Sequence, residues 1–260
     1  MDDFCPIIGF DHLEFYVGNA KQASLFYQHG FGFTPTAYSG LETGERDLAS
    51  YVMSQGKIRL VLTAALHPDH SVARHVLQHG DGVGVIALTV PDARRAFEET
   101  TKRGALGAIE PFELEDADGV LRVSAVHAFG DTLLKFVERG EYGGAFAPGY
   151  ERRAQLNGGG VGLRFIDHVV GNVELGKMNE WVHFFAHALG FSQLLHFDDK
   201  QISTEYSALM SKVMQDGTGK VKFPINEPAE GRRKSQIEEY LEYYNGPGVQ
   251  HVVNDVTVDS

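Results

Sequence analysis

Short runs of alternating hydrophobic and polar residues, separated by stretches with helical spacing, organise the first part of the sequence. Leu13, Phe15 and Val17 alternate along the chain as in a half-buried strand. Asn19 is a favourable N-cap for the helical stretch that follows it. Two more apolar alternations flank the polar turn at residues 55–57, which is typical of a strand pair. The pattern predicts a module that begins with a strand and a helix and ends in strands.

The same order of elements then starts again. We expect a strand at Val83–Val90, a helix at Pro91–Arg103, and strands at Leu121–Val126 and Thr132–Val137. Proline at the start of the helix fits this prediction, because the first turn does not need its missing N–H group. The first half of the chain is therefore predicted to contain two βαβββ modules.

Landmarks of the first half return in the second half in the same order. Phe-Asp-His-Leu at 10–13 corresponds to Ile-Asp-His-Val at 166–169, and Gly-Val pairs open apolar runs at residues 82 and 248. Such a repeat indicates two copies of one domain. In the second copy we expect a helix from about residue 177, strands over 202–214 and 219–225, a helix over 235–244 and a strand over 249–253.

A glycine-rich stretch separates the two copies. We predict an N-terminal domain over residues 7–140, a linker over 141–162, and the first part of a second domain over 163–260. Residues that would correspond to the last strands of the first copy do not follow the final predicted strand. The fold class is therefore α+β, with repeated βαβββ modules in two tandem domains, the second of them incomplete.

The amino-acid composition limits the classes of molecule that the protein is expected to bind. The chain has 260 residues, with 23 Lys and Arg against 35 Asp and Glu, so its formal net charge is 23 − 35 = −12. Its 43% hydrophobic and 22% charged residues are globular values. A strongly acidic balance argues against nucleic acid as a partner, because that binding is driven by Lys and Arg. It does not exclude a small anionic ligand, whose affinity depends on local charges.

The N-terminus and the single cysteine bear on location. Cys5, the only cysteine, has no partner for an intramolecular disulfide, which is typical of a reducing cytoplasm. The first residues are acidic where a signal peptide needs bases. No stretch approaches the roughly 20 apolar residues that span a bilayer. We therefore expect a cytoplasmic protein with no membrane partner, and a cysteine at a frayed terminus.

The repeat turns two histidines into a candidate pair. His168 lies on the opening strand of the third module and His251 on that of the fourth, and paired strands would bring both into one cavity. Two imidazoles and a carboxylate are suitable ligands for a divalent transition metal. In the first copy the same positions hold His12 and Val85, and Lys135 stands at the third position. A valine and a lysine cannot complete a metal site, so we expect the first copy to be a scaffold and His12 to be structural.

Other motifs are weaker. His75 and His79 would share one helix face, but the glutamate of an HExxH zinc motif is missing, so we expect a solvated face. The sequence has no glycine-rich phosphate loop ahead of a helix and no G-x-S-x-G motif, which disfavours nucleotide-binding enzymes and serine hydrolases. Histidines that flank the Trp181 helix are expected to be exposed: His183, His187 and His196.

Neutral hydrogen-bonding residues occur near the candidate metal strands. They are Ser207, Asn226, Gln236 and Gln250. Such groups can orient a polar aromatic or keto-acid ligand without adding charge. Residues of these types at strand ends also commonly face water, and the sequence leaves both interpretations open.

Several segments carry a resemblance to a known family. They are Ile-Asp-His-Val-Val-Gly-Asn-Val at 166–173, Met-Asn-Glu-Trp-Val at 178–182, Glu-Tyr-Ser-Ala-Leu-Met-Ser-Lys at 205–212, Phe-Pro-Ile-Asn-Glu-Pro at 223–228, Lys-Ser-Gln-Ile at 234–237 and Gly-Val-Gln-His at 248–251. With them the chain resembles the 4-hydroxyphenylpyruvate dioxygenase family from about residue 7 to residue 252. The resemblance implies a vicinal-oxygen-chelate (glyoxalase/bleomycin-resistance-like) fold.

The resemblance also implies a reaction and a site. The family uses Fe(II) and O₂ to convert an aromatic 2-oxo acid, 4-hydroxyphenylpyruvate, to homogentisate and CO₂ in tyrosine and phenylalanine catabolism. His168 and His251 match the two histidine ligands of the iron. Ser207, Asn226, Gln236 and Gln250 match the positions that hold the substrate. We also expect a homo-oligomer.

The sequence departs from the family pattern near its C-terminus. The glutamate that is the third iron ligand belongs to a strand after residue 260, and the family's closing helix also lies beyond it. Asn254 and Asp255 interrupt the apolar strand after His251, and 253–260 has no recognisable counterpart. We expect this chain, supplied with Fe(II) and ascorbate, not to turn over 4-hydroxyphenylpyruvate appreciably.

Three other functions stay open at this stage. The chain could be a non-catalytic remnant that serves as a scaffold or binding protein. It could be an oxygenase like 4-hydroxymandelate synthase, which shares the iron site but is expected to lack the Ser-Ala-Leu-Met and Pro-Ile-Asn-Glu-Pro segments. An extradiol dioxygenase of the same fold is disfavoured by those segments.

Overall fold

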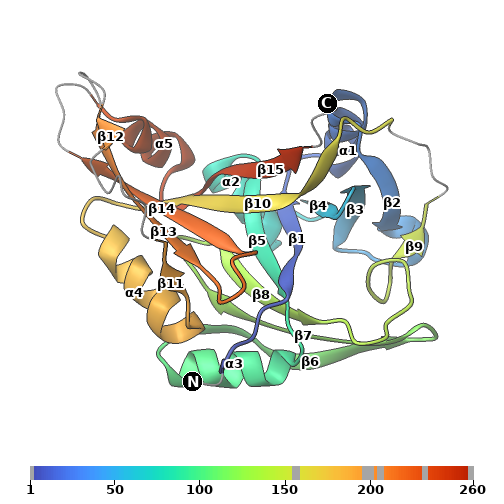
Figure 1. Cartoon of the computed structure of the whole chain (residues 1–260). Coiled ribbons are helices and arrows are strands. Elements are labelled where there is room, and N and C mark those ends of the chain that lie inside the picture. The colour runs from blue at the N-terminus through green and yellow to red at the C-terminus, as the bar shows by residue number, and fades with distance from the viewer. Residues whose placement is uncertain (1–2, 154–158, 195–201, 204–207, 230–233, 257–260) are drawn as a thin grey trace.

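The computed structural model describes residues 3–153, 159–194, 202–203, 208–229 and 234–256. It consists of two β-sheets with short helices on their faces (Figure 1). Within these ranges, no helix is both long and apolar enough to cross a membrane.

The first copy forms a nine-stranded sheet with the order β6-β7-β8-β5-β1-β4-β3-β2-β9. Its two modules meet where the opening strands β1 and β5 pair in antiparallel fashion. A one-turn 3₁₀ helix lies at Leu41–Thr43. The elements are β1 (Gly9–Tyr16), α1 (Ala20–Phe31), β2 (Thr34–Ser39), β3 (Leu48–Gln55), β4 (Ile58–Ala65), α2 (Ser71–His79), β5 (Gly82–Thr89), α3 (Ala93–Lys102), β6 (Gly107–Asp116), β7 (Gly119–His127), β8 (Leu133–Glu138) and β9 (Glu151–Arg152).

The second copy contributes a six-stranded sheet in which β10 lies between β14 and β15. The strand β15 pairs with β10 as β5 pairs with β1, so it is the opening strand of a fourth module. The elements are β10 (Leu163–Asn172), α4 (Met178–Leu189), β11 (Ser192–Gln193), β12 (Ile202–Ser203), β13 (Ala208–Gln215), β14 (Lys222–Ala229), α5 (Gln236–Tyr244) and β15 (Gly248–Val256).

Strand register confirms the repeat residue by residue. His12 lies opposite Ala87 in the β1–β5 pair, and His168 lies opposite Val253 in the β10–β15 pair. The offsets are 156 residues for the first strand and 166 residues for the second, as the sequence landmarks predicted. The expected α+β architecture of repeated βαβββ modules is therefore confirmed.

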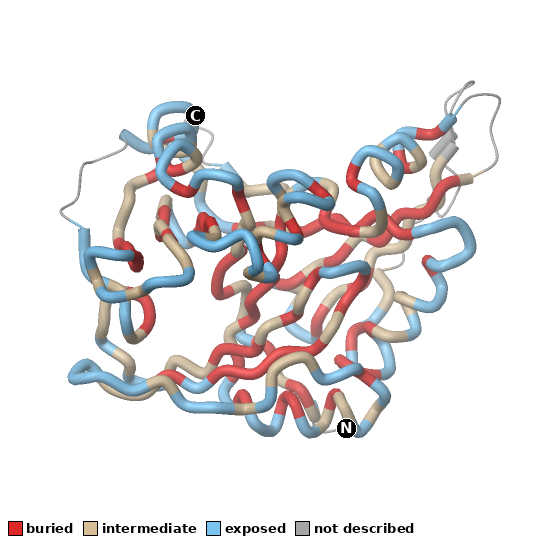
Figure 2. Tube along the Cα trace, turned by 180° about the vertical axis from the view of Figure 1, so that it is seen from behind, coloured by how far each residue is buried: buried red, intermediate tan, exposed pale blue. Residues whose placement is uncertain are grey.

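The two copies pack against each other through one apolar core. Phe10 of β1 meets Phe223 of β14 edge to face, with ring centroids 5.8 Å apart. Phe129 meets Trp181 of α4 in the same way at 5.9 Å. Figure 2 shows the buried residues along the central strands and the exposed residues mostly in loops and on outer helix faces. The two copies therefore share a core and are not separate domains joined only by a linker.

The glycine-rich stretch between the copies is partly ordered against the first sheet. Phe146 and Ala147 are buried, and β9 pairs with the edge strand β2. The domain boundaries at residues 140 and 163 stay predictions.

Three expectations were wrong, and one strand was missed. The predicted strand over 202–214 is two strands, because β12 pairs antiparallel with β13. The strand β15 continues through Asn254 and Asp255 to Val256, and these three residues pair with β10, so the polar residues do not interrupt the strand. Cys5 is 2% exposed rather than frayed, and burial raises the pKa of its thiol to about 12. The edge strand β6 was missed, because none of its residues is buried and Pro111 interrupts the apolar pattern.

A buried ion pair between Arg139 and Asp11 links the end of the first copy to its first strand. Arg139 donates through Nε and Nη2 to the two carboxylate oxygens of Asp11, at 2.6 and 2.8 Å. His12 Nδ1 donates to Asp11 Oδ1 at 2.6 Å. Burial alone raises the pKa of Asp11, but the hydrogen bonds from His12 and Arg139 outweigh it and hold the pKa far below its usual range. The carboxylate is therefore ionised throughout the neutral range.

We predict that Asp11→Asn lowers the free energy of unfolding at pH 7 by about 3 kcal/mol, because it leaves Arg139 without its buried partner. The folded-state pKa of Asp11 is depressed, so its contribution is complete above pH 4 and is lost as the pH falls below that value. Urea unfolding from pH 7 to pH 3 measures both effects. The repeat-equivalent variant Asp167→Asn is the control; its carboxylate is 36% exposed, so it should lose less. Equal losses in both variants would contradict the prediction.

Candidate functional site

The two candidate metal ligands lie on neighbouring strands of the second sheet. His168 is on β10 and is 25% exposed, and His251 is exposed on β15. Their positions are diagonal in the antiparallel register, since His168 lies opposite Val253 and His251 opposite Val170. The two imidazole rings are 6.2 Å apart between centroids and meet edge to face. The structure thus brings together the pair that the repeat predicted.

Two β-bulges determine the surroundings of the His168 and His251 side chains. The register shifts between Ile166 and His168 on β10, and again at Gln250 on β15. Each extra residue turns its side chain toward the histidine that follows it. Asp167 Oδ2 accepts from Nδ1 of His168, and Gln250 Oε1 accepts from Nδ1 of His251, both at 2.7 Å. Within the part of the chain that the structure describes, the Nε2 atom of neither ring makes a hydrogen bond.

The hydrogen bonds around the pair leave ring nitrogens that can bind a cation. Lys222 of β14 donates to Asp167 Oδ1 at 2.7 Å, and the hydrogen bonds from His168 and Lys222 lower the pKa of this carboxyl group. Burial, together with the neighbouring His168, lowers the pKa of His251. A neutral imidazole has a lone pair on its unprotonated nitrogen, and a hydrogen bond at Nδ1 leaves that lone pair on Nε2. The donor set therefore fits a divalent transition metal.

Asn226 is buried beside a residue that the sequence interpretation did not select. Its Nδ2 donates to Oδ1 of Asn172 at 3.3 Å, and the two residues lie opposite each other in the parallel β10–β14 pair. Nδ2 of Asn172 is buried and has no hydrogen-bond partner among the described residues. An unpaired buried donor is costly, so it marks a place where a ligand acceptor would be stabilised. The available signal was the position of Asn172 on β10, four residues after His168.

The remaining predicted residues are placed differently. Gln236 is exposed in the first turn of α5 and makes no hydrogen bond to His168 or His251. Gln250 contacts His251 directly, as described above. Ser207 lies outside the described residues.

The equivalent position in the first copy is closed. His12 is 3% exposed and lies against Phe146, with ring centroids 5.0 Å apart. His12, Val85 and Lys135 line a cavity of about 310 Å³ that the 146–150 segment also lines. Burial lowers the pKa of His12 despite its hydrogen bond to a carboxylate. The apolar valine and the cationic lysine leave this cavity without a metal ligand set.

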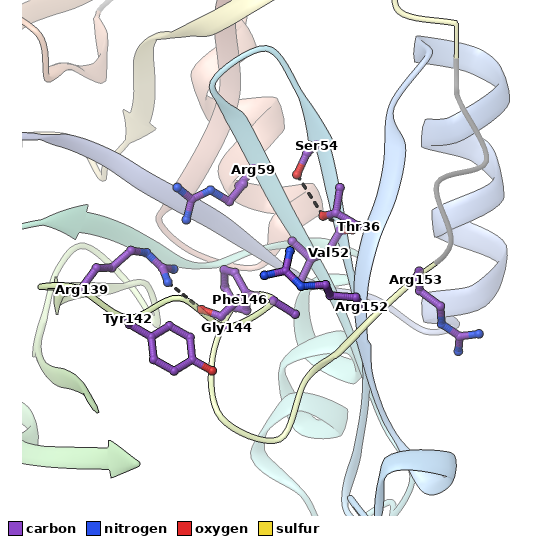
Figure 3. A pocket seen from close by; sticks show the side chains of 11 residues that line it. Thr36, Val52, Ser54, Arg59, Arg139, Tyr142, Gly144, Phe146, Arg152 and Arg153 are labelled. Atoms are coloured by element: carbon purple, nitrogen blue, oxygen red, sulfur yellow. Dashed lines mark hydrogen bonds between the residues drawn. The ribbon is translucent and has the colours of Figure 1, made fainter. Parts of the chain in front are cut away.

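A second cavity on the first copy, of about 390 Å³, is lined by arginines (Figure 3). Arg59 and Arg152 point toward it, whereas Arg153 points away. Arg139 is engaged by Asp11. The cavity is positively charged in an acidic chain, but the residues that line it include neither histidine of the candidate pair.

The expectation of a solvated face for α2 was wrong. His75 and His79 are only 6% and 5% exposed, because the C-terminal end of α5 covers them. The His79 ring stacks on Tyr244 with centroids 4.4 Å apart, and burial lowers the pKa of His75 to about 4. His183 and His187 on α4 are exposed as predicted, and His196 lies outside the described residues.

The sequence matches known families over most of its length. The profile of the Glyoxalase/Bleomycin resistance protein/Dioxygenase superfamily matches residues 9–121 and 165–257. The chain is 44% identical to 4-hydroxyphenylpyruvate dioxygenase of Dictyostelium discoideum, over 94% of this chain and 68% of that protein. It is 41% identical to the enzyme of that name from Yarrowia lipolytica, over 94% of this chain and 64% of that protein. The chain thus spans about two thirds of the length of these relatives.

A solved structure has the same fold. A mutant of 4-hydroxymandelate synthase from Streptomyces coelicolor superimposes with a TM-score of 0.82 at 29% sequence identity. The match covers 95% of this chain and 70% of that one.

We predict that Asp167→Asn weakens binding of a divalent transition metal at the histidine pair by about 10- to 100-fold, because the carboxylate orients and polarises His168. Competition with a chromophoric chelator measures the affinity under anaerobic conditions with Fe(II). Glu180→Gln, at an exposed position on α4, is the control and should bind as the unmodified chain does. An unchanged affinity in Asp167→Asn would show that the carboxylate does not support a metal ligand.

Proposed function

This chain belongs to the 4-hydroxyphenylpyruvate dioxygenase family, within the glyoxalase/bleomycin resistance protein/dioxygenase superfamily, and on that premise we propose that it acts in the conversion of 4-hydroxyphenylpyruvate and O₂ to homogentisate and CO₂. The reaction is a step of tyrosine and phenylalanine catabolism. The proposal includes Fe(II) as cofactor, an aromatic 2-oxo acid and O₂ as substrates, a cytoplasmic location and a homo-oligomer.

The observation that carries the proposal is the pair of imidazoles on adjacent strands. His168 and His251 are 83 positions apart in sequence, yet their rings are in edge-to-face contact. Each Nδ1 is committed to a neighbouring oxygen, so each Nε2 can bind a metal. Two histidines and a carboxylate form the ligand set of many non-haem Fe(II) oxygenases.

We assign the metal site of the proposed enzyme to His168 and His251. Asp167 and Gln250 hold the two rings in place, and Lys222 holds Asp167 through its ion pair. Fe(II), when bound, supplies the electrons for O₂ chemistry and a chelation site for the 2-oxo acid. The protein's contribution is to fix the ligands and to orient the substrate.

The substrate assignment combines buried and exposed polar residues. Asn226 and Asn172 form a buried amide pair, and the unpaired Nδ2 of Asn172 is a donor for an oxygen of the substrate. A neutral donor can orient an aromatic hydroxyl or a keto acid without adding charge to the site. Gln236 on α5, Gln250 and Ser207 belong to the same proposed set through the family resemblance.

The test is an oxygen-uptake assay with product analysis. We would assay this chain and a version extended to the full length of the relatives, with Fe(II), ascorbate and 4-hydroxyphenylpyruvate. The extended protein is expected to release homogentisate, and His168→Ala should lower the rate at least 100-fold because it removes a metal ligand. His183→Ala, on the exposed face of α4, is the matched control and should keep the rate.

The same assay separates the alternatives. Release of 4-hydroxymandelate instead of homogentisate would favour the synthase, whose structure has the same fold. An extended protein that binds Fe(II) but consumes no oxygen would overturn the proposed activity and favour a binding or scaffold role.

A further inference from the structure

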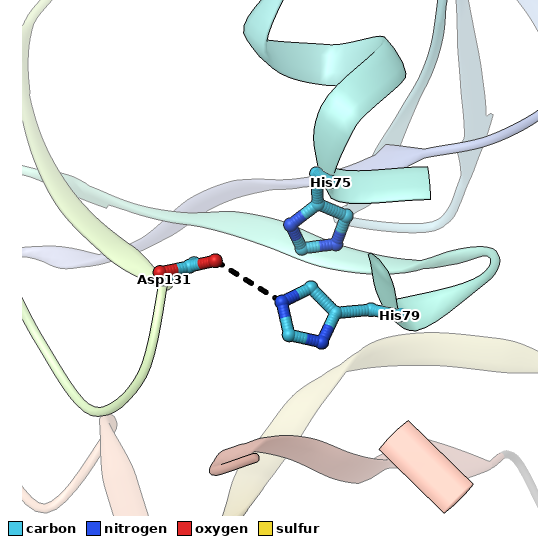
Figure 4. A group of neighbouring side chains, drawn as sticks. All are labelled: His75, His79 and Asp131. Atoms are coloured by element: carbon cyan, nitrogen blue, oxygen red, sulfur yellow. Dashed lines mark hydrogen bonds and ion pairs between the residues drawn. The ribbon is translucent and has the colours of Figure 1, made fainter. Parts of the chain in front are cut away.

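A second group of metal-ligand side chains lies away from the His168–His251 pair. One ring nitrogen each of His75 and His79 and a carboxylate oxygen of Asp131 all lie within 4.8 Å of one another (Figure 4). The two histidines come from successive turns of α2, and Asp131 comes from the turn between β7 and β8. None of the three belongs to the candidate oxygenase site.

The hydrogen bonds of His79 leave two hydrogen-bond acceptors facing each other. Its Nδ1 donates to the main-chain carbonyl of Tyr244, which fixes the ring and places the lone pair of the neutral imidazole on Nε2. That Nε2 faces Oδ2 of Asp131 at 3.1 Å. Two acceptors at this distance repel each other unless a cation lies between them. The cation is either an additional proton on His79 or a metal ion.

The position of His75 distinguishes these two cations. Its ring lies 4.7 Å from that of His79, and the Tyr244 hydroxyl lies 3.3 Å from its Nε2. A proton would satisfy only the pair formed by His79 and Asp131, and it would put an imidazolium beside a second buried imidazole. A metal ion uses all three side chains. We therefore propose that His75, His79 and Asp131 bind a divalent transition cation, with Zn²⁺ as the best match.

One of the ligand separations already suits this cation. In a tetrahedral zinc site with ligands about 2.1 Å from the metal, neighbouring ligand atoms are about 3.4 Å apart. The separation of His79 Nε2 and Asp131 Oδ2, 3.1 Å, is already close to this value. The histidines are almost fully buried, whereas the Asp131 side chain is 60% exposed. The carboxylate can therefore adjust to the ion, and water can reach the remaining coordination position.

The site would act on the packing between the two copies. All three ligands belong to the first copy, but the carbonyl that orients His79 belongs to Tyr244 at the end of α5 in the second copy. A bound ion would therefore tie α2, the β7–β8 turn and, through this carbonyl, α5 into one unit. Zn²⁺ is then expected to raise the unfolding temperature of the chain.

Zinc titration in a background that lacks the other histidine pair tests the proposal. We would strip the His168→Ala/His251→Ala chain with a chelator and titrate it with Zn²⁺ against a chromophoric competitor. One equivalent should bind, and Asp131→Asn should weaken it at least tenfold and abolish the thermal shift. Asp131 is exposed, so this variant should fold. Co²⁺ in place of Zn²⁺ should give visible d–d absorption that Asp131→Asn removes.

Two matched variants control for weak surface binding. Asp118→Asn changes an exposed carboxylate of the β6–β7 hairpin, and His187→Ala breaks the exposed His183–His187 pair on α4. Both should keep the full zinc affinity. The proposal is overturned if the background chain binds no zinc, or if Asp131→Asn binds it as tightly as Asp118→Asn does. Failure of the proposed oxygenase activity would leave these measurements unchanged, because the background lacks His168 and His251.

Discussion

The antiparallel pairing of module-opening strands is the constraint on which the rest of the structure depends. It joins β1 to β5 in the first copy and β10 to β15 in the second, with the same register in both. A slip of one residue would turn every side chain of a strand to the opposite face. The pairing therefore determines both the apolar core and the contact between His168 and His251. The bulges at Asp167 and Gln250 place a hydrogen-bond acceptor beside each imidazole.

The two copies use one backbone arrangement for different purposes. In the first copy, Asp11 is enclosed by Arg139 and His12, and Phe146 covers the imidazole. Burial makes such a polar group depend on fully satisfied partners, so this position contributes to stability. In the second copy, Asp167 is 36% exposed and His251 is exposed. The corresponding side chains there are accessible to a ligand, and the Asp-His unit can support chemistry instead of packing.

The modules, the repeat and the histidine pair could be predicted from the sequence. The modules follow from the period of the hydrophobic residues, and the repeat and the histidine pair follow from landmarks that recur at a constant offset. Sequence reasoning did not reach the bulges, because a bulge is defined by the register between two strands that are distant in the sequence. The role of Gln250 as a partner of His251 was missed for that reason. His75 and His79 were expected on a solvated face because the helix lacks the glutamate of an HExxH motif. The residue that covers them is Tyr244, 165 positions after His79. Lys222 pairs with Asp167 only because β14 lies beside β10.

The two histidine clusters follow one physical rule and differ in what surrounds them. In both, an oxygen acceptor holds Nδ1 and directs the Nε2 lone pair toward a possible cation, with Asp167 serving His168 and the Tyr244 carbonyl serving His79. The His168–His251 pair is partly exposed on two adjacent strands, where a substrate can share the ion's coordination sphere. The α2 histidines are buried under α5, with the carboxylate of Asp131 as the exposed ligand. An ion held there has little room for a substrate, so its free energy of binding would go into holding the two copies together.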